Sequence, residues 1–296
     1  MVYILLILLC ILVFCLYRRN RKLKKLSLDL DQLLHDGTPL PIREYQEGEL
    51  SVIANQLQKV TLRLLESADQ SRADKEQLAD ALANISHQLR TPLTAMNLTA
   101  VLLSDPDLTQ QRRGELNREL RSLLNRMDWL VESLLKLSKL DAGTVTMAKE
   151  EISLRELISR AVSPLEVAMD LRDQRFAVSC REERLTVDPV WTAEALGNIL
   201  KNCSEHTPAG GTISASVQEN ALYTAVTVED TGSGFDPRDI PHLFERFYKG
   251  ANATETSYGI GLALARTIIT AQNGTIQAMN GTSGARFEIR FYKSVI

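Results

Sequence analysis

Two consecutive heptad patterns constrain the fold of this chain more than any other feature of its sequence. Between Leu78 and Leu103, mostly apolar residues alternate spacings of four and three, the pattern of a helix that buries one narrow stripe. A second pattern of the same kind runs from Leu116 to Leu137, and Asp105-Pro106-Asp107 separates the two. We therefore predict two helices joined by a short turn.

A single hairpin of two such helices cannot bury both apolar stripes well. Two hairpins can pair into a four-helix bundle in which all stripes face inward. Ala142-Gly143 ends the second helix. Residues 71–145 are therefore expected to form a dimerisation domain, and the chain is expected to be a homodimer.

The N-terminal segment from Val2 to Tyr17 is apolar and is followed by a run of six Lys and Arg residues between Arg18 and Lys25. A bilayer span normally takes about 20 apolar residues, so the segment is short, but flanking arginines can extend it. A signal peptide would carry its positive charge first. We predict a single-pass anchor over residues 1–17, with almost nothing outside and the rest in the cytoplasm; a surface-lying helix or a signal segment are the alternatives.

Residues 18–70 are expected to connect this anchor to the dimerisation domain. A break at residues 36–41 precedes apolar residues at helical spacing: Leu50, Ile53, Leu57, Val60 and Leu64. Two amphipathic helices around an extended connector resemble a HAMP signal-relay module. A juxtamembrane coiled coil is an equal alternative.

Residues 150–296 change to a mixed pattern of helices and strands. Helices separated by short alternating strands predict an α/β sandwich with helices on one face of a mixed sheet. The expected helices are 154–171, 190–205 and 261–272, and the expected strands are 175–180, 184–187, 211–218, 223–229, 275–279 and 285–291.

Composition narrows the function classes. The chain is 44% hydrophobic and 24% charged, as in globular proteins, and carries a net charge of −3. The basic run near the N-terminus leaves the remainder distinctly acidic, which argues against nucleic-acid binding. The four cysteines lack metal-ligand spacing and form no evident disulfide framework.

His87 lies at the outermost heptad position of the first helix, two residues after Ile85. An exposed imidazole is largely neutral at neutral pH and supplies a nucleophilic nitrogen. The string Ser86 to Leu93 (SHQLRTPL) resembles the phosphoacceptor box of histidine kinases, which implies phosphorylation on His87. In that family, the position of Thr91 orients a water that removes phosphate from the regulator, and the mid-helix Pro92 should bend the helix.

Gln88 departs from the family pattern, which usually has a carboxylate directly after the phosphoacceptor. A carboxylate can accept the proton of the attacking imidazole, whereas an amide can only orient it. The resemblance therefore implies catalytic roles for His87, Gln88 and Thr91. Together with Glu205 in the C-terminal half, Gln88 also favours an alternative in which the protein acts mainly as a phosphatase or binds ATP but phosphorylates slowly.

Three further elements predict a nucleotide site. Asp230-Thr231-Gly232-Ser233-Gly234 follows a predicted strand, and its glycines permit close ligand approach. Asn198 and Asn202 lie one turn apart on a helix and can offer oxygens to Mg²⁺. Residues 259–265 (GIGLALA) form a glycine turn that opens a helix, whose N–H groups suit phosphate.

In this order the elements resemble the ATP-binding fold shared by histidine kinases and gyrase-like ATPases, over residues 150–296. The resemblance implies that Asp230 binds the adenine amino group, that Asn202 holds Mg²⁺ and that Asn198 supports it. The other implied nucleotide-binding residues are His206 as a pocket wall, Gly232 and Gly234 around the base, Gly259, Gly261 and Leu262 beside the phosphates, and Arg246 and Lys249 as phosphate contacts.

Glu205 also departs from the family, because many relatives have a lysine there. An acidic group near the triphosphate should repel it modestly, and Lys201 or Arg246 would compensate. Ser257-Tyr258 replaces commonly flanking glycines, which implies a stiffer lid over ATP.

Together these features predict a sensor histidine kinase of a two-component system in the bacterial cytoplasmic membrane. With ATP and Mg²⁺ as cofactors, it would phosphorylate His87 and pass the phosphate to a response-regulator aspartate, with regulator phosphatase activity as a second capacity. The stimulus could arrive within the membrane, through a partner membrane protein or from the cytoplasm. The rivals are a chaperone- or topoisomerase-type ATPase and a membrane scaffold without activity.

Overall fold

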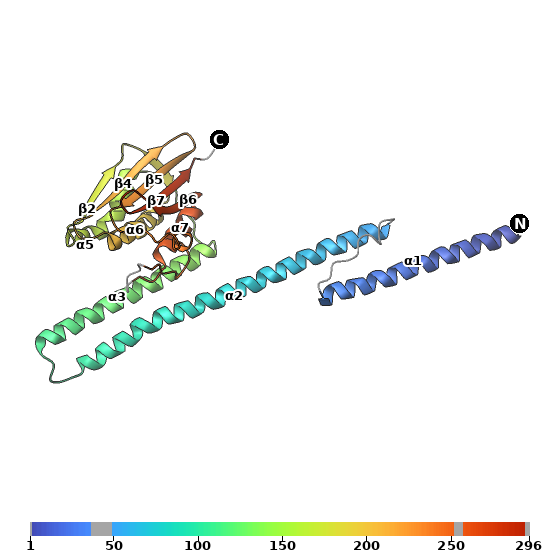
Figure 1. The fold of residues 1–296 in the computed structure, drawn as a ribbon, viewed down its shortest axis with the longest axis horizontal. Helices are drawn as coiled ribbons and strands as arrows, with labels where there is room; N and C mark the ends of the chain where they lie inside the picture. Colours follow the sequence, from blue (N-terminus) through green and yellow to red (C-terminus); the bar gives the residue numbers. More distant parts are fainter. Residues whose placement is uncertain (1, 37–48, 252–256, 294–296) are drawn as a thin grey trace. The chain divides into compact units, whose positions relative to one another are not determined.

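The computed structural model describes residues 2–36, 49–251 and 257–293. The chain divides into two compact units, residues 1–82 and residues 83–296. Figure 1 shows the elements of each unit in sequence colours. The candidate site lies entirely in the second unit.

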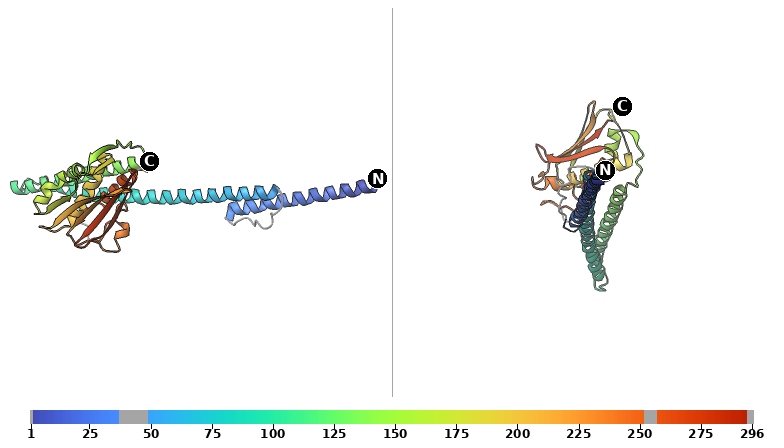
Figure 2. Two further views of the ribbon diagram at one scale, coloured as in Figure 1. Left: turned by 90° about the horizontal axis from the view of Figure 1, so that it is seen from above. Right: turned by 90° about the vertical axis from the view of Figure 1, so that its right-hand side faces the viewer.

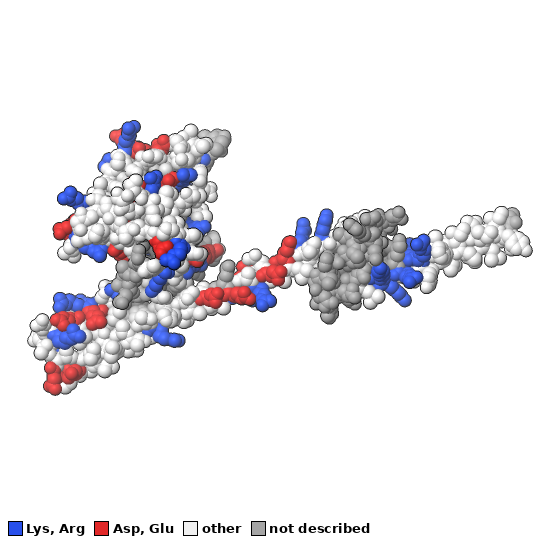
Figure 3. Space-filling view, in the orientation of Figure 1, with Lys and Arg blue, Asp and Glu red and all other residues white. Residues whose placement is uncertain are grey.

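The first unit contains helix α1 (Val2–Asp36) and the beginning of helix α2 (Glu49–Leu103). An apolar stretch from Val2 to Lys25, 24 residues long, is sufficient in length and composition to cross a bilayer. Figure 3 shows its N-terminal part without charged side chains, followed by a cluster of Lys and Arg. The predicted connector between two relay helices falls on residues 37–48, which lie outside the described residues.

The predicted helical hairpin is present. The part of α2 within the second unit and helix α3 (Gln110–Asp141) flank a short turn. Thr109 caps α3 by accepting a hydrogen bond from the Arg112 N–H. Most residues of the predicted apolar stripes are buried or half-buried, namely Ile85, Leu89, Pro92, Met96, Thr99 and Leu103 in α2 and Leu116, Leu120, Leu123, Met127, Leu130, Leu134 and Leu137 in α3. Leu82, which the same stripe includes, is 56% exposed.

The remainder of the second unit is an α/β sandwich. Its five-stranded sheet has the order β2-β4-β5-β7-β6, in which only the β2–β4 pair is parallel. A separate antiparallel pair joins β1 and β3. The strands are β1 (Glu150–Ser153), β2 (Arg175–Ser179), β3 (Arg184–Val187), β4 (Thr212–Glu219), β5 (Tyr223–Asp230), β6 (Gly274–Asn280) and β7 (Ala285–Tyr292).

Helices cover one face of this sheet, as Figures 1 and 2 show. They are α4 (Leu154–Val162), α5 (Glu166–Asp170), α6 (Pro189–His206) and α7 (Gly261–Ala271), with single 3₁₀ turns η2 (Ser163–Leu165) and η3 (Ile240–His242). Asp188 caps α6 by accepting hydrogen bonds from the N–H groups of Val190 and Trp191. Pro189 follows at the first helical position, where its missing N–H is not needed.

Two sequence expectations for this domain were wrong in detail. The helix expected over residues 154–171 is divided into α4, η2 and α5, because Pro164 cannot donate the helical hydrogen bond. Strand β1 was not expected. It pairs with β3, and Ile152 lies opposite Leu185. The strand was missed because Glu150 and Glu151 interrupt the alternation of apolar and polar residues that predicts a strand.

The C-terminal half of α3 packs on this sandwich. Leu130 and Leu137 are buried in the same hydrophobic core as residues of α4, α6 and α7, and Leu134 and Leu140 pack against it. This packing holds one face of α3 next to α6 and α7, where the candidate site lies.

Candidate functional site

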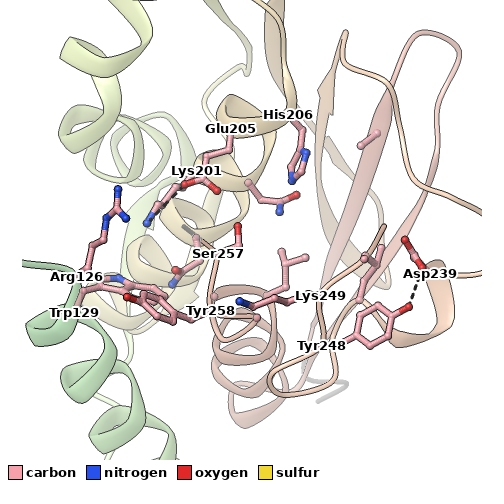
Figure 4. Close-up of a pocket in the computed structure, with 18 of the residues that line it drawn as sticks. Arg126, Trp129, Lys201, Glu205, His206, Asp239, Tyr248, Lys249, Ser257 and Tyr258 are labelled. Atoms are coloured by element: carbon pink, nitrogen blue, oxygen red, sulfur yellow. Dashed lines mark hydrogen bonds and ion pairs between the residues drawn. The ribbon is translucent and has the colours of Figure 1, made fainter. Parts of the chain in front are cut away.

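A cavity of about 700 Å³ opens between α6, the start of α7 and α3. Figure 4 shows that its side chains come from both the sandwich and α3. Of the residues predicted for nucleotide binding, the cavity brings together Asn198, Asn202, His206, Asp230, Gly234, Lys249, Gly259, Gly261 and Leu262. A cavity in which a few polar groups converge is the expected location of a ligand-binding site.

Asp230 ends strand β5 and is only 4% exposed. Its Oδ1 accepts hydrogen bonds from the N–H groups of Gly232 (2.8 Å) and Ala285 (3.0 Å). Its Oδ2 is buried and has no hydrogen-bond partner among the described residues. A buried carboxylate oxygen without a partner is costly, so this atom is positioned to accept a hydrogen bond from a ligand.

Cys203 of α6 lies against this carboxylate. Burial, together with the negative charge of Asp230, raises the pKa of the Cys203 thiol well above its ordinary value. The thiol is therefore neutral and acts as a small apolar group. It contributes to the water-excluded surroundings of Asp230.

Two glycines are required by close backbone contacts around the cavity. A Cβ on Gly232 would lie 2.5 Å from the carbonyl oxygen of His206. Gly259 has φ +70°, and a Cβ there would collide with the backbone of Phe247 and Tyr248. The Phe247 N–H donates to the Gly259 carbonyl at 2.8 Å, which fixes the turn that leads into α7.

Helix α7 begins at Gly261 on the cavity wall. Its first N–H groups have no partner within the helix, and the positive end of the helix dipole attracts anions. The Asn198 amide supports this end: its Nδ2 donates to the Glu194 carbonyl at 3.0 Å, and its Oδ1 lies beside Gly261. Asn202, one turn further along α6, lines the cavity with an amide suited to a hard cation.

Lys201 and Glu205 also lie on α6 and line the cavity. The Lys201 Nζ is 3.9 Å from the Glu205 Oε1. Lys201 thus offsets the acidic residue that stands where many relatives have a lysine. Of the two compensating cations considered from the sequence, the structure places only Lys201 next to Glu205.

Arg246 lies elsewhere. Its guanidinium forms an ion pair with Asp141 at the end of α3, at 2.6 Å, and it is not among the residues that line the cavity. Lys249 does line the cavity (Figure 4).

Asp239 anchors the segment that follows Tyr248. It accepts hydrogen bonds from the Tyr248 hydroxyl and from the Ala251 N–H, each at 2.8 Å. The hydrogen bond to Asp239 raises the pKa of Tyr248. Sequence reasoning missed Asp239, because no motif marks an aspartate in a turn between strand and helix.

Trp129 of α3 forms a wall of the cavity that sequence reasoning also missed. Its ring stacks on Tyr258, with centroids 6.1 Å apart, and Lys201 Nζ lies 4.7 Å from its ring centroid. Figure 4 shows these groups together at the α3 side of the cavity. Arg118, Arg121, Ser122, Asn125 and Arg126 of α3 complete this wall.

His87, Gln88 and Thr91 lie on α2, outside the cavity. The His87 side chain is exposed, as its outermost heptad position predicts, and Gln88 is half-buried. The Thr91 hydroxyl donates to the His87 carbonyl at 3.3 Å. Pro92 lies inside the helix and is buried.

Comparison with known families matches both halves of this arrangement. The His Kinase A (phospho-acceptor) domain model matches residues 77–143, and the histidine kinase-, DNA gyrase B- and HSP90-like ATPase model matches residues 187–294. The chain belongs to the two-component sensor histidine kinases. The identification agrees with the resemblance in both motifs and with the order of the two domains.

Curated relatives of this histidine kinase include sensor protein KdpD of Clostridium acetobutylicum, 26% identical over 270 residues that cover 86% of this chain and 30% of the relative. Heme sensor protein HssS of Staphylococcus aureus strain Newman is 27% identical over 263 residues, covering 88% of this chain and 55% of the relative. The kinase thus spans about half the length, or less, of these relatives.

Solved structures share the fold. Histidine kinase AdeS of Acinetobacter baumannii superimposes with a TM-score of 0.58 at 22% identity, covering 71% of this chain and 98% of AdeS. Histidine kinase ThkA, solved in complex with response regulator protein TrrA, gives a TM-score of 0.59 at 21% identity, with 77% of this chain and 66% of ThkA covered.

Proposed function

We propose that this chain uses ATP to phosphorylate its own His87 and then transfers the phosphate to an aspartate of a response regulator. The observation that carries the proposal is the buried, unpartnered Oδ2 of Asp230 in a cavity that also contains the start of α7. A hydrogen-bond acceptor for the adenine amino group and an anion-attracting helix end in one cavity match the two ends of ATP.

The proposed reaction is a phosphoryl transfer in which the protein positions groups and neutralises charge. A nitrogen of the His87 imidazole attacks the γ-phosphorus, the bond to the bridging oxygen breaks, and ADP leaves. Mg²⁺, held by Asn202 with support from Asn198, would supply charge neutralisation at the phosphates. Because Gln88 cannot accept a proton, the imidazole proton passes to solvent.

The remaining binding roles follow the family pattern. His206 forms a wall beside the base, and Gly232 and Gly234 shape the loop that follows Asp230. Gly261 and Leu262 open α7 towards the phosphates. We assign the phosphate contact from the preceding segment to Lys249, which lines the cavity, and not to Arg246, which pairs with Asp141.

The proposed assembly is a homodimer through the hairpin of residues 71–145. Several large apolar side chains of this hairpin remain exposed in one chain and would be covered in a four-helix bundle. They are Leu82, Leu93, Leu98, Val101, Leu102, Leu124, Val131 and Leu135.

The proposed cellular setting is a bacterial cytoplasmic membrane, with residues 1–17 at the core of a single-pass anchor. Residues 18–70 would relay a signal to the hairpin, and the ATP-binding domain of residues 150–296 would face the cytoplasm. The response regulator is the proposed phosphate acceptor, and a membrane protein that senses the stimulus is a further proposed partner.

The test is labelling of the full chain in detergent micelles with γ-labelled ATP and Mg²⁺. We expect acid-labile label on the natural sequence and none on His87→Ala. His35→Ala is the matched control, since it removes another histidine of the chain, and it should retain the label. Label that persists in His87→Ala, or acid-stable label, would refute the proposed phosphoacceptor.

A further inference from the structure

The wall that α3 contributes to the nucleotide cavity is rich in positive charge. Arg118, Arg121 and Arg126 all line the cavity. Together with Ser122 and Trp129 they follow the three- and four-residue spacing that gathers side chains on one helix face. One face of α3 therefore contacts the same space as the ATP-binding residues of the sandwich.

The position of Trp129 shows which end of the cavity this face meets. Trp129 stacks on Tyr258, which directly precedes Gly259 and the start of α7. Figure 4 shows His206 on the side of the cavity away from Trp129, and a Cβ on Gly232 would meet both the His206 carbonyl and the Asp230 carboxylate. The α3 wall thus lies at the phosphate end of the cavity and not at the adenine end.

Two cations converge at this end. Lys201 Nζ lies over the Trp129 ring at 4.7 Å, and Arg126 is one helical turn from Trp129 on the same cavity wall. Figure 4 shows both head groups at the α3 side. Like charges held at one place repel each other, so this arrangement favours an anion between them.

The two cations differ in their other partners. Lys201 is already engaged by Glu205 at 3.9 Å and by the Trp129 ring. Arg126, by contrast, forms no ion pair within the described residues and is exposed to the cavity. Arginine is suited to phosphate because its planar guanidinium presents paired N–H donors to phosphate oxygens.

From this arrangement we infer that Arg126 is a nucleotide-binding residue, which contacts the terminal phosphates of ATP when the sandwich is docked on α3. The inference rests on the proposed ATP-dependent function. It assigns part of the phosphate binding to the dimerisation domain, in addition to the ATP-binding domain. It also explains how a site with Glu205 in place of a lysine still accommodates a triphosphate.

A consequence is that triphosphate binding and docking stabilise each other. A ligand that contacts both α3 and α6 binds the docked arrangement more tightly and therefore increases its population. Loss of the γ-phosphate would weaken this link.

Calorimetric titration of the full chain in micelles tests the inference. The ligands are the β,γ-imido analogue of ATP, ADP and AMP, each with Mg²⁺. Arg126→Gln should weaken binding of the triphosphate analogue about tenfold, the typical loss of a charge-assisted hydrogen bond, and leave AMP within about twofold. Arg126→Lys should give an intermediate loss, because it keeps the charge but not the planar fork.

Arg113→Gln is the matched control, because Arg113 is exposed on α3 and does not line the cavity. It should bind all three nucleotides like the natural sequence. A loss shared by ADP and the triphosphate, but not AMP, supports a contact to the β-phosphate.

Two results would overturn the inference alone: unchanged affinity for the triphosphate in Arg126→Gln, or an equal loss for all three nucleotides. If the natural sequence binds none of them, the proposed function fails as well. If it binds them and labels His87 while Arg126→Gln behaves normally, only the role of Arg126 is refuted.

Discussion

Trp129 of α3 stacks on Tyr258 of the ATP-binding domain, with ring centroids 6.1 Å apart and ring planes inclined by 25°. The contact joins α3 to the residue that precedes the glycine turn leading into α7. Lys201 adds a cation over the same indole ring. One side chain of α3 therefore connects two elements of the nucleotide site.

Trp129→Ala should loosen this junction. Stacked aromatic pairs and cation–π contacts each contribute roughly 0.5–1.5 kcal/mol, so the docked arrangement should be less populated. We expect faster amide hydrogen exchange around Tyr258 and Gly261, measured by mass spectrometry. Glu132→Ala removes an exposed side chain of the same helix that does not line the cavity and should leave exchange there unchanged; if both variants exchange alike, the stack does not hold the junction.

Asp230→Asn should weaken ATP binding about 10- to 100-fold, because an amide cannot replace the lone carboxylate acceptor without presenting a donor or losing the bonds from Gly232 and Ala285. The natural sequence should also bind ATP more tightly than inosine triphosphate, whose hypoxanthine base lacks the amino group. The variant should lose this preference. Equal binding of both nucleotides by the natural sequence would show that Oδ2 does not contact the base.

Gln88→Glu should increase the initial rate of His87 labelling. A carboxylate next to the nucleophile can accept the imidazole proton, and general-base catalysis of this kind supports a gain of about tenfold or more. The rate is measured with γ-labelled ATP at saturating concentration. Gln88→Ala should show no gain. A Glu variant that labels no faster than the natural sequence would mean that proton removal does not limit the reaction.

Gly259→Ala should destabilise the ATP-binding domain and reduce nucleotide affinity. The substitution forces a side chain into a positive-φ position against the Tyr248 carbonyl, which costs about 1–3 kcal/mol. Gly114→Ala is the contrasting control. Its Cβ meets no atom within 4 Å, and an alanine inside a helix should stabilise the chain by about 0.5–1 kcal/mol. Thermal unfolding with and without nucleotide distinguishes the two effects.

Cys203 should make stability depend on pH in the alkaline range. Its folded-state pKa is raised by burial and by Asp230, so the thiol stays protonated in the folded state while the unfolded thiol ionises above its ordinary pKa of about 8.5. The stability that the buried, protonated thiol contributes is therefore fully present below that pH and is lost as the pH rises above it. The difference in melting temperature between the natural sequence and Cys203→Ala should therefore shrink from neutral to alkaline pH; a constant difference would contradict the shift.

The heptad patterns were enough to predict the hairpin, because Leu116, Leu130 and Leu137 follow the spacing of a buried stripe. The break at Pro164 and the short strand β1 were not predicted. Whether the helix breaks and whether the strand forms both depend on the surrounding structure. The proline interrupts a pattern that otherwise continues as a helix, and β1 exists only because β3 is available to pair with it.

The residues of the candidate site could likewise be predicted only in part. The residues around Asp230 and Gly259 carry local motifs, so the sequence marks them as candidates. Trp129 and Arg126 carry no motif, and only the packing of α3 on the sandwich places them at the cavity. Arg246 shows the reverse: its motif suggested a phosphate contact, whereas its position in the fold gives it Asp141 as a partner.

The two faces of α3 also restrict how its sequence can vary. Leu130 and Leu137 on one face pack into the core, while Arg126 and Trp129, at neighbouring positions, line the cavity. Substitutions that are neutral in most surface helices would here alter either folding or ligand contacts. We therefore expect few tolerated changes along this part of α3 in a mutational scan.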